Sequence, residues 1–100
     1  MKYFENYVEE AKAIKGKLSR FLREFELFVF GSAVRGDYSP GLSDIDVAVV
    51  SEEFNDRKKL EEVYDFLWDE YFDSPFEFHL LTKKKWEFYR KFVGKDYIKV

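Results

Sequence analysis

The stretch LFVFGSAVRGDYSPGLSDIDVAVV, residues 27–50, decides the fold of this chain. It begins with an apolar run, 27–30, and ends with the β-branched run 45–50, and each run predicts a buried strand. Residues 31–44 between them hold three Gly and one Pro, which is typical of a loop. The stretch therefore predicts two strands of one sheet joined by a loop.

Helical patterns surround these two strands. Apolar residues recur every three or four positions over 3–25, which predicts a first helix. A second helix is predicted to begin after Asn55 as its cap and to end near Phe72. The segment FEFHLLT, 76–82, alternates apolar and polar residues and predicts a third strand. A last helix is predicted from the cap Thr82 to the closing Gly94.

The order of these elements predicts the fold class. Helix, strand, strand, helix, strand, helix (α-β-β-α-β-α) indicates an α/β (α+β) fold, a small mixed sheet with helices packed on one face. With 100 residues the chain is long enough for one hydrophobic core, so we expect a single domain over residues 1–100.

The composition excludes several classes of protein. Without cysteine the chain has no disulfide, thiolate metal site or cysteine nucleophile. A net charge of −3 argues against strong non-specific binding to nucleic acid. No stretch approaches the ~18 apolar residues of a membrane span, so we expect a cytoplasmic protein. The aromatic content of 21% leaves two interpretations open, a crowded aromatic core or an exposed partner surface.

Two aspartates open the second predicted strand. Asp44 and Asp46 are two residues apart, so the pleat turns both carboxylates to one face, with Cα atoms roughly 6 to 7 Å apart. Ile45 between them points to the other face, into apolar packing. Like charges this close are stabilised by a cation, and Mg²⁺ prefers carboxylate oxygen. The structural alternative is that Asp44 caps the strand entrance and Asp46 lies in solvent.

A glycine and a serine follow the first predicted strand directly. Gly31 lets backbone N–H groups approach an anion, and Ser32 adds a hydroxyl donor. A short helix beginning here would turn its positive end toward phosphates, and Arg35, one turn on, would add a positive charge. We therefore predict a phosphate-binding loop, with an ordinary Gly-Ser turn as the alternative.

The motif GSAVRGDYSPGLSDIDVAVV, 31–50, resembles the signature of the nucleotidyltransferases of the DNA polymerase β superfamily, and among them the minimal nucleotidyltransferases. In that family the Gly-Ser binds the β- and γ-phosphates of a nucleoside triphosphate, and the Asp-x-Asp pair holds two divalent metals. The resemblance implies nucleotide binding for Gly31 and Ser32, and metal binding and catalysis for Asp44 and Asp46. The Ser-to-Asp spacing is one residue longer than is usual, which indicates an insertion in the turn at 39–42.

The family also has a third carboxylate on a neighbouring strand, typically an Asp. The third predicted strand has none, so the resemblance implies that Glu77 is the third metal ligand and catalytic residue. Strand alternation puts Glu77 and His79 on the face opposite Phe76 and Phe78, and His79 would there position the acceptor. The alternative is a solvent-facing polar pair on an edge strand.

The resemblance implies an activity, the transfer of a nucleoside monophosphate, AMP from ATP, to an acceptor with two Mg²⁺ or Mn²⁺ ions. Minimal nucleotidyltransferases often form toxin and antitoxin pairs with a helical HEPN-type protein. We therefore expect the acceptor to be a hydroxyl on such a partner toxin, or a homodimer to supply it. The alternative is a binding module, a catalytically weak or inactive domain of this fold that neutralises a partner by complex formation. Glu77 in place of Asp supports this alternative, while the retained Ser32, Asp44 and Asp46 oppose it.

Overall fold

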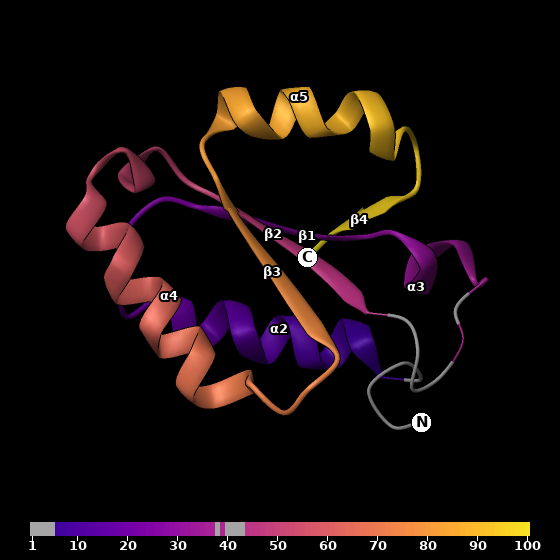
Figure 1. Cartoon of the computed structure of the whole chain (residues 1–100), viewed down its shortest axis with the longest axis horizontal. Helices are drawn as coiled ribbons and strands as arrows, with labels where there is room; N and C mark the ends of the chain where they lie inside the picture. The colour runs from indigo at the N-terminus through magenta and orange to yellow at the C-terminus, as the bar shows by residue number, and fades with distance from the viewer. Residues whose placement is uncertain (1–5, 38, 40–43) are drawn as a thin grey trace.

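A mixed four-stranded sheet with helices on both faces forms the fold (Figure 1). The structure is a computed structural model, and it describes residues 6–37, 39 and 44–100. Its elements, in chain order, are α2 (Tyr7–Leu18), β1 (Glu26–Phe30), α3 (Ser32–Arg35), β2 (Ile45–Val50), the 3₁₀ helix η1 (Glu52–Asn55), α4 (Arg57–Tyr71), β3 (Phe76–Leu81), α5 (Lys83–Val93) and β4 (Tyr97–Lys99).

The strands lie in the order β3-β2-β1-β4. β1 is antiparallel to both of its neighbours, β2 and β4, whereas β2 and β3 are parallel because α4 carries the chain back between them. The register places Phe30 opposite Asp46 and Asp46 opposite Glu77. The C-terminal end of β1 and the N-terminal ends of β2 and β3 therefore lie at the same end of the sheet.

The main core lies between the sheet and the helices α2 and α4. The strands contribute alternate residues to it, as expected for a pleated sheet, and the helices contribute residues spaced by three or four. Its buried members include Leu27, Val29, Ile45, Val47, Val49 and Phe76 from the strands, Ala11, Ile14 and Leu18 from α2, and Val63, Leu67 and Tyr71 from α4.

The opposite face of the sheet is covered by α5 (Figure 1). Trp86 is 4% exposed and stacks on Phe28, with ring centroids 4.7 Å apart. The α/β class and the predicted order of elements are confirmed, but the prediction that the helices pack on one face is wrong. The physical reason is that β1 and β2 are apolar on both faces, so that Phe28, Ala48 and Val50 also need cover.

Several element boundaries differ from the sequence predictions. The first helix ends at Leu18 rather than near residue 25, and residues 1–5 lie outside the described part of the chain. Asp56 rather than Asn55 caps α4, because its carboxylate accepts a hydrogen bond from the Lys58 N–H at 3.0 Å. The cap Thr82 and the closing Gly94 of α5 are confirmed.

Two further points complete the comparison of the fold with its prediction. The short strand β4 was not predicted, because three residues give too little alternation to detect. The insertion expected in the turn at 39–42 falls largely outside the described residues. Within the described part of the chain, no helix is long and apolar enough to cross a membrane.

Candidate active site

A cavity of about 400 Å³ opens at the end of the sheet where β1 ends and β2 and β3 begin. It brings together the residues that the sequence proposed for nucleotide binding, metal binding and catalysis. Three more apolar residues complete its walls, one from β1 and two from α5. The lining consists of Gly31, Ser32, Arg35, Asp44, Asp46 and Glu77, together with Phe30, Phe92 and Val93.

The turn after β1 is shaped by Gly31. Its φ of +86° and ψ of −154° lie in a backbone region that is open essentially to glycine alone. A Cβ at this position would also collide with the Asp46 carboxylate, so glycine is required here for space as well as for conformation. The short helix α3 then begins at Ser32, as predicted, and leaves Ser32 at the rim of the cavity.

The three carboxylates form one cluster. Asp44 and Asp46 both line the cavity, as the predicted common face requires, and the register places Glu77 beside Asp46. Partial burial raises the pKa of Glu77, and a hydrogen bond with Asp44 and the negative charge of Asp46 raise this pKa further. The cluster is thus a site of unfavourable like charge.

His79 lies directly against this cluster. Its Nε2 is 3.1 Å from Oδ1 of Asp46 and 3.9 Å from Oε1 of Glu77. Contacts with the rings of Phe30 and Tyr89 hold the imidazole in place, at centroid distances of 5.3 and 5.6 Å. The sequence placed His79 on the correct face but assigned it to the acceptor. Its contact with Asp46 depends on the pairing of β2 with β3, which local patterns do not reveal.

The donor set fits a divalent cation. Asp46, Glu77 and His79 each offer a ligand atom, and these atoms lie within 4.8 Å of one another. Carboxylate oxygen suits Mg²⁺ and Mn²⁺, and imidazole nitrogen is a ligand for Mn²⁺ and other transition metals. Among the described residues no Lys or Arg forms an ion pair with Asp44, Asp46 or Glu77, and His79 is the only basic side chain within 4.0 Å of these carboxylates.

Arg35 is the one positively charged side chain among the described residues that line the cavity. Its Nε lies 3.2 Å from Oδ2 of Asp37, and both side chains are about half exposed. Exposed pairs of this kind contribute little to stability, so the guanidinium can exchange Asp37 for another anion at low cost. Arg35 therefore lies where a phosphate group could compete for it.

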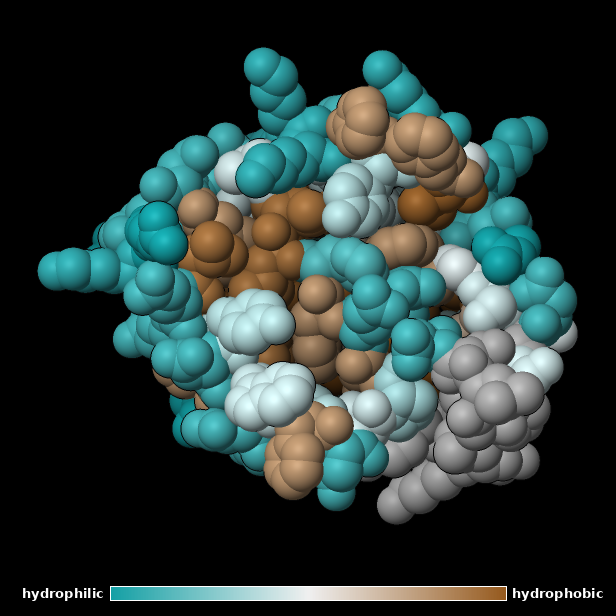
Figure 2. Space-filling view, viewed as in Figure 1, coloured by the Kyte–Doolittle hydropathy of each residue, from teal (hydrophilic) through white to brown (hydrophobic). Residues whose placement is uncertain are grey.

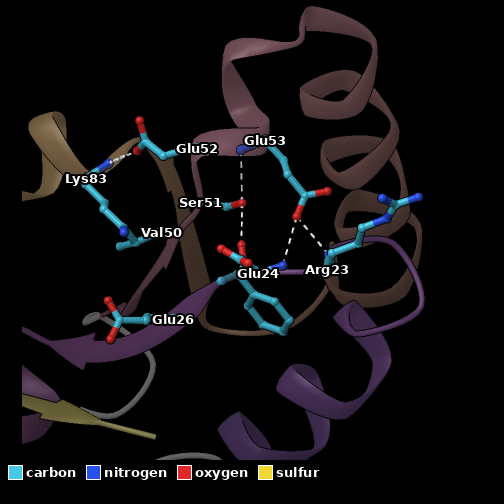
Figure 3. Close-up of a pocket in the computed structure, with 9 residues that line it drawn as sticks. Arg23, Glu24, Glu26, Val50, Ser51, Glu52, Glu53 and Lys83 are labelled. Atoms are coloured by element: carbon cyan, nitrogen blue, oxygen red, sulfur yellow. Dashed lines mark hydrogen bonds between the residues drawn. The ribbon is translucent and has the colours of Figure 1, made fainter.

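A larger cavity, of about 730 Å³, lies at the opposite end of the sheet (Figure 3). Two of its acidic groups have structural partners: the Glu53 carboxylate accepts the N–H groups of Arg23 and Glu24, and Glu52 accepts the N–H of Lys83. The N–H bonds from Glu24 and Arg23 hold the pKa of Glu53 below its usual value. We therefore place the chemistry in the smaller cavity, where the carboxylates oppose one another.

The protein is thus a small α/β domain with a carboxylate cluster, able to hold a cation, beside a Gly-Ser turn. The family model described as "Nucleotidyltransferase domain" matches residues 11–100, and the chain belongs to this family. A nucleoside triphosphate substrate is implied by the family, whose members generally use divalent metals.

Two solved structures are similar to the chain. One, "Crystal structure of putative nucleotidyltransferase", is 42% identical in sequence and superposes with a TM-score of 0.77. The match covers 95% of this chain and 98% of the other chain. A second "putative nucleotidyltransferase", from Sulfolobus solfataricus, is 24% identical and shares the fold, with a TM-score of 0.65, 98% of this chain covered and 82% of the other. No curated protein matches the chain.

Proposed function

We propose that this protein transfers a nucleoside monophosphate, AMP from ATP, to an acceptor hydroxyl, with Mg²⁺ or Mn²⁺ as cofactor. The observation that carries the proposal is the common cavity of the Gly-Ser turn, Arg35 and the three carboxylates. These are the two kinds of group that the reaction needs, one for the triphosphate and one for cations.

The metal ligands in this proposal are Asp44, Asp46 and Glu77, with His79 as a further donor to the ion beside Asp46. Two bound ions would supply charge neutralisation for the triphosphate and would increase the acidity of the acceptor hydroxyl. Support comes from the raised pKa of Glu77, which reflects partial burial first, then the hydrogen bond with Asp44 and the nearby negative charge of Asp46 that a divalent cation would relieve.

The remaining residues bind and orient the substrates. The Ser32 hydroxyl and the backbone at Gly31 would hold the β- and γ-phosphates, and Arg35 would add a charged hydrogen bond. The acceptor oxygen forms a bond to the α-phosphorus as the bond to the β-phosphate oxygen breaks, and pyrophosphate leaves. The Glu77 carboxylate would take the proton of the acceptor hydroxyl.

A protein acceptor is the second part of the proposal. We propose a hydroxyl on a HEPN-type partner, with the chain acting as its antitoxin. Support comes from the resemblance of the motif to minimal nucleotidyltransferases and from large aromatic side chains exposed on α4 and α5, Tyr64, Trp68, Phe72, Phe88 and Phe92. Such side chains are typical of protein interfaces.

The decisive experiment compares Asp46→Asn with Asp96→Asn, an exposed control that lies outside the cavity lining. Each protein is incubated with labelled nucleoside triphosphates, Mg²⁺ or Mn²⁺, and candidate acceptor proteins. We expect Asp46→Asn to abolish transfer, to keep the fold, and to melt at the same or a slightly higher temperature without metal, because like-charge repulsion is relieved. Transfer that persists in Asp46→Asn would refute the metal mechanism.

Glu77→Gln tests the third carboxylate. The triphosphate is held chiefly by other residues, so we expect the transfer rate to fall far more than triphosphate affinity. Equal losses of rate and affinity would remove Glu77 from this role. A wild-type protein that binds nucleotide and a partner but never transfers would instead favour the binding module, for which Glu77 in place of Asp is the supporting observation.

A further inference from the structure

An aromatic row runs along the exposed side of α4. Tyr64, Trp68 and Phe72 are spaced four residues apart and are 57%, 62% and 65% exposed. Residues four apart lie on the same side of a helix, and the rings of Trp68 and Phe72 are 6.3 Å apart. Exposed apolar surface that is contiguous in this way marks a site of protein contact.

The aromatic row borders a groove beside β3, the edge strand of the sheet. Two adjoining hollows of about 280 and 350 Å³ form this α4–β3 groove, and both are lined by Tyr64 and Phe78. Leu60 and Leu80 add apolar walls to the larger hollow. Figure 2 shows pale and brown residues gathered on this face of the molecule, between α4 and α5.

An acidic row runs beside the aromatic row on the same helix. Glu61, Asp65 and Asp69 also repeat every four residues. Residues 61–73 contain six acidic residues and no basic one, and in the described part of the chain neither Asp65 nor Asp69 has an ion-pair partner. An occupant of the groove must therefore present positive charge beside its apolar stripe.

The groove is continuous with the candidate active site. Glu77 lines both the smaller hollow of the groove and the cavity that holds Asp44 and Asp46. A segment bound along α4 and β3 would consequently end next to the carboxylate cluster.

A second copy of the chain would also offer the chemistry that the groove requires. α5 exposes Phe88 and Phe92 beside Lys84 and Lys91, so it resembles the required occupant. However, α4 and α5 cover opposite faces of the sheet (Figure 1). A contact of α4 with the α5 of another copy builds rings or open chains unless the reciprocal contact forms at the same time and closes the pair.

We propose that the α4–β3 groove docks a helix of a partner protein whose apolar stripe is flanked by Lys and Arg, and that this partner is the acceptor. Only the statement that this partner is the acceptor rests on the proposed function. The aromatic row binds the apolar stripe, and the acidic row binds the basic flanks. The end of the docked helix near Glu77 then lies next to the active-site cavity.

The test uses two synthetic helical peptides with the same Leu and Phe stripe, one flanked by Lys and the other by Glu. Binding to the full chain is measured by calorimetry and by Trp68 emission, since Trp86 is buried, without nucleotide or metal. The variants are Trp68→Ala and Asp65→Lys/Asp69→Lys, and Phe88→Ala is the matched control because its ring is equally exposed on α5. Circular dichroism verifies the fold of each variant.

We expect the Lys peptide to bind the wild type, the Glu peptide not to bind, and both groove variants to weaken binding about tenfold or more. Phe88→Ala should bind like the wild type. The proposal is overturned by absent binding, by equal binding of the two peptides, or by a loss in Phe88→Ala that matches the loss in Trp68→Ala. Wild-type rings or chains in sedimentation that Trp68→Ala dissolves would also overturn it.

These outcomes are separable from those of the proposed function. A groove that binds the Lys peptide in a protein without transferase activity would refute the activity and leave the docking surface intact. Transfer by a protein whose groove binds neither peptide would refute only the docking surface.

Discussion

Replacing Gly31 by alanine adds a methyl group against the Asp46 carboxylate and forces an L-residue to φ +86° and ψ −154°. The backbone strain costs on the order of 1–3 kcal/mol. The carboxylate must also shift to avoid the new Cβ. A displacement of about 1 Å at a catalytic group can reduce a rate by about 100-fold. We therefore expect Gly31→Ala to lose both stability and site function.

Gly36→Ala is the matched control. Gly36 also has a positive φ, +83°, but a Cβ there meets no atom within 4 Å. We expect a stability loss of about 1–2 kcal/mol from the left-handed backbone alone, with Mn²⁺ affinity and transfer rate unchanged. The assay combines denaturant unfolding with Mn²⁺ calorimetry and the transfer rate. If Gly31→Ala binds Mn²⁺ and transfers as well as Gly36→Ala does, the inference that Asp46 requires a glycine opposite it is refuted.

Three further predictions concern stability. Trp86→Ala should destabilise by about 3–5 kcal/mol in denaturant unfolding, because the ring is 4% exposed and packs between α5 and the sheet; a loss below 1 kcal/mol would contradict this packing. Gly16→Ala in α2 should stabilise by about 0.5–1 kcal/mol, since its Cβ meets no atom within 4 Å and alanine favours helix; destabilisation would count against it. The pKa of Glu53 is lowered in the folded protein. Its contribution to the free energy of unfolding is therefore fully present above the ordinary pKa of 4.5 and is lost as the pH falls through the lowered pKa. Glu53→Ala should thus melt lower at pH 7 and lose less on acidification below about pH 4.5 than the wild type; parallel melting curves would oppose this.

Features that depend on residues close together in the chain could be predicted from the sequence. Short apolar runs identified β1 and β2, alternation with a period of two identified β3, and spacing by three or four identified the helices. Gly31 and Ser32 directly follow one predicted strand, and Asp44 and Asp46, two residues apart, begin the next. These positions in the sequence were sufficient to predict their places at strand ends. Local geometry connects these residues directly, so no tertiary information was needed.

Contacts between residues far apart in the chain could be seen only in the folded structure. The contact between His79 and Asp46 joins positions 33 residues apart, and it depends on the parallel pairing of β2 with β3. The placement of α5 on the second face depends on Trp86 packing against Phe28. An amphipathic helix pattern shows that a helix has a buried side, but not which surface buries it, because that choice follows from the packing of the whole chain.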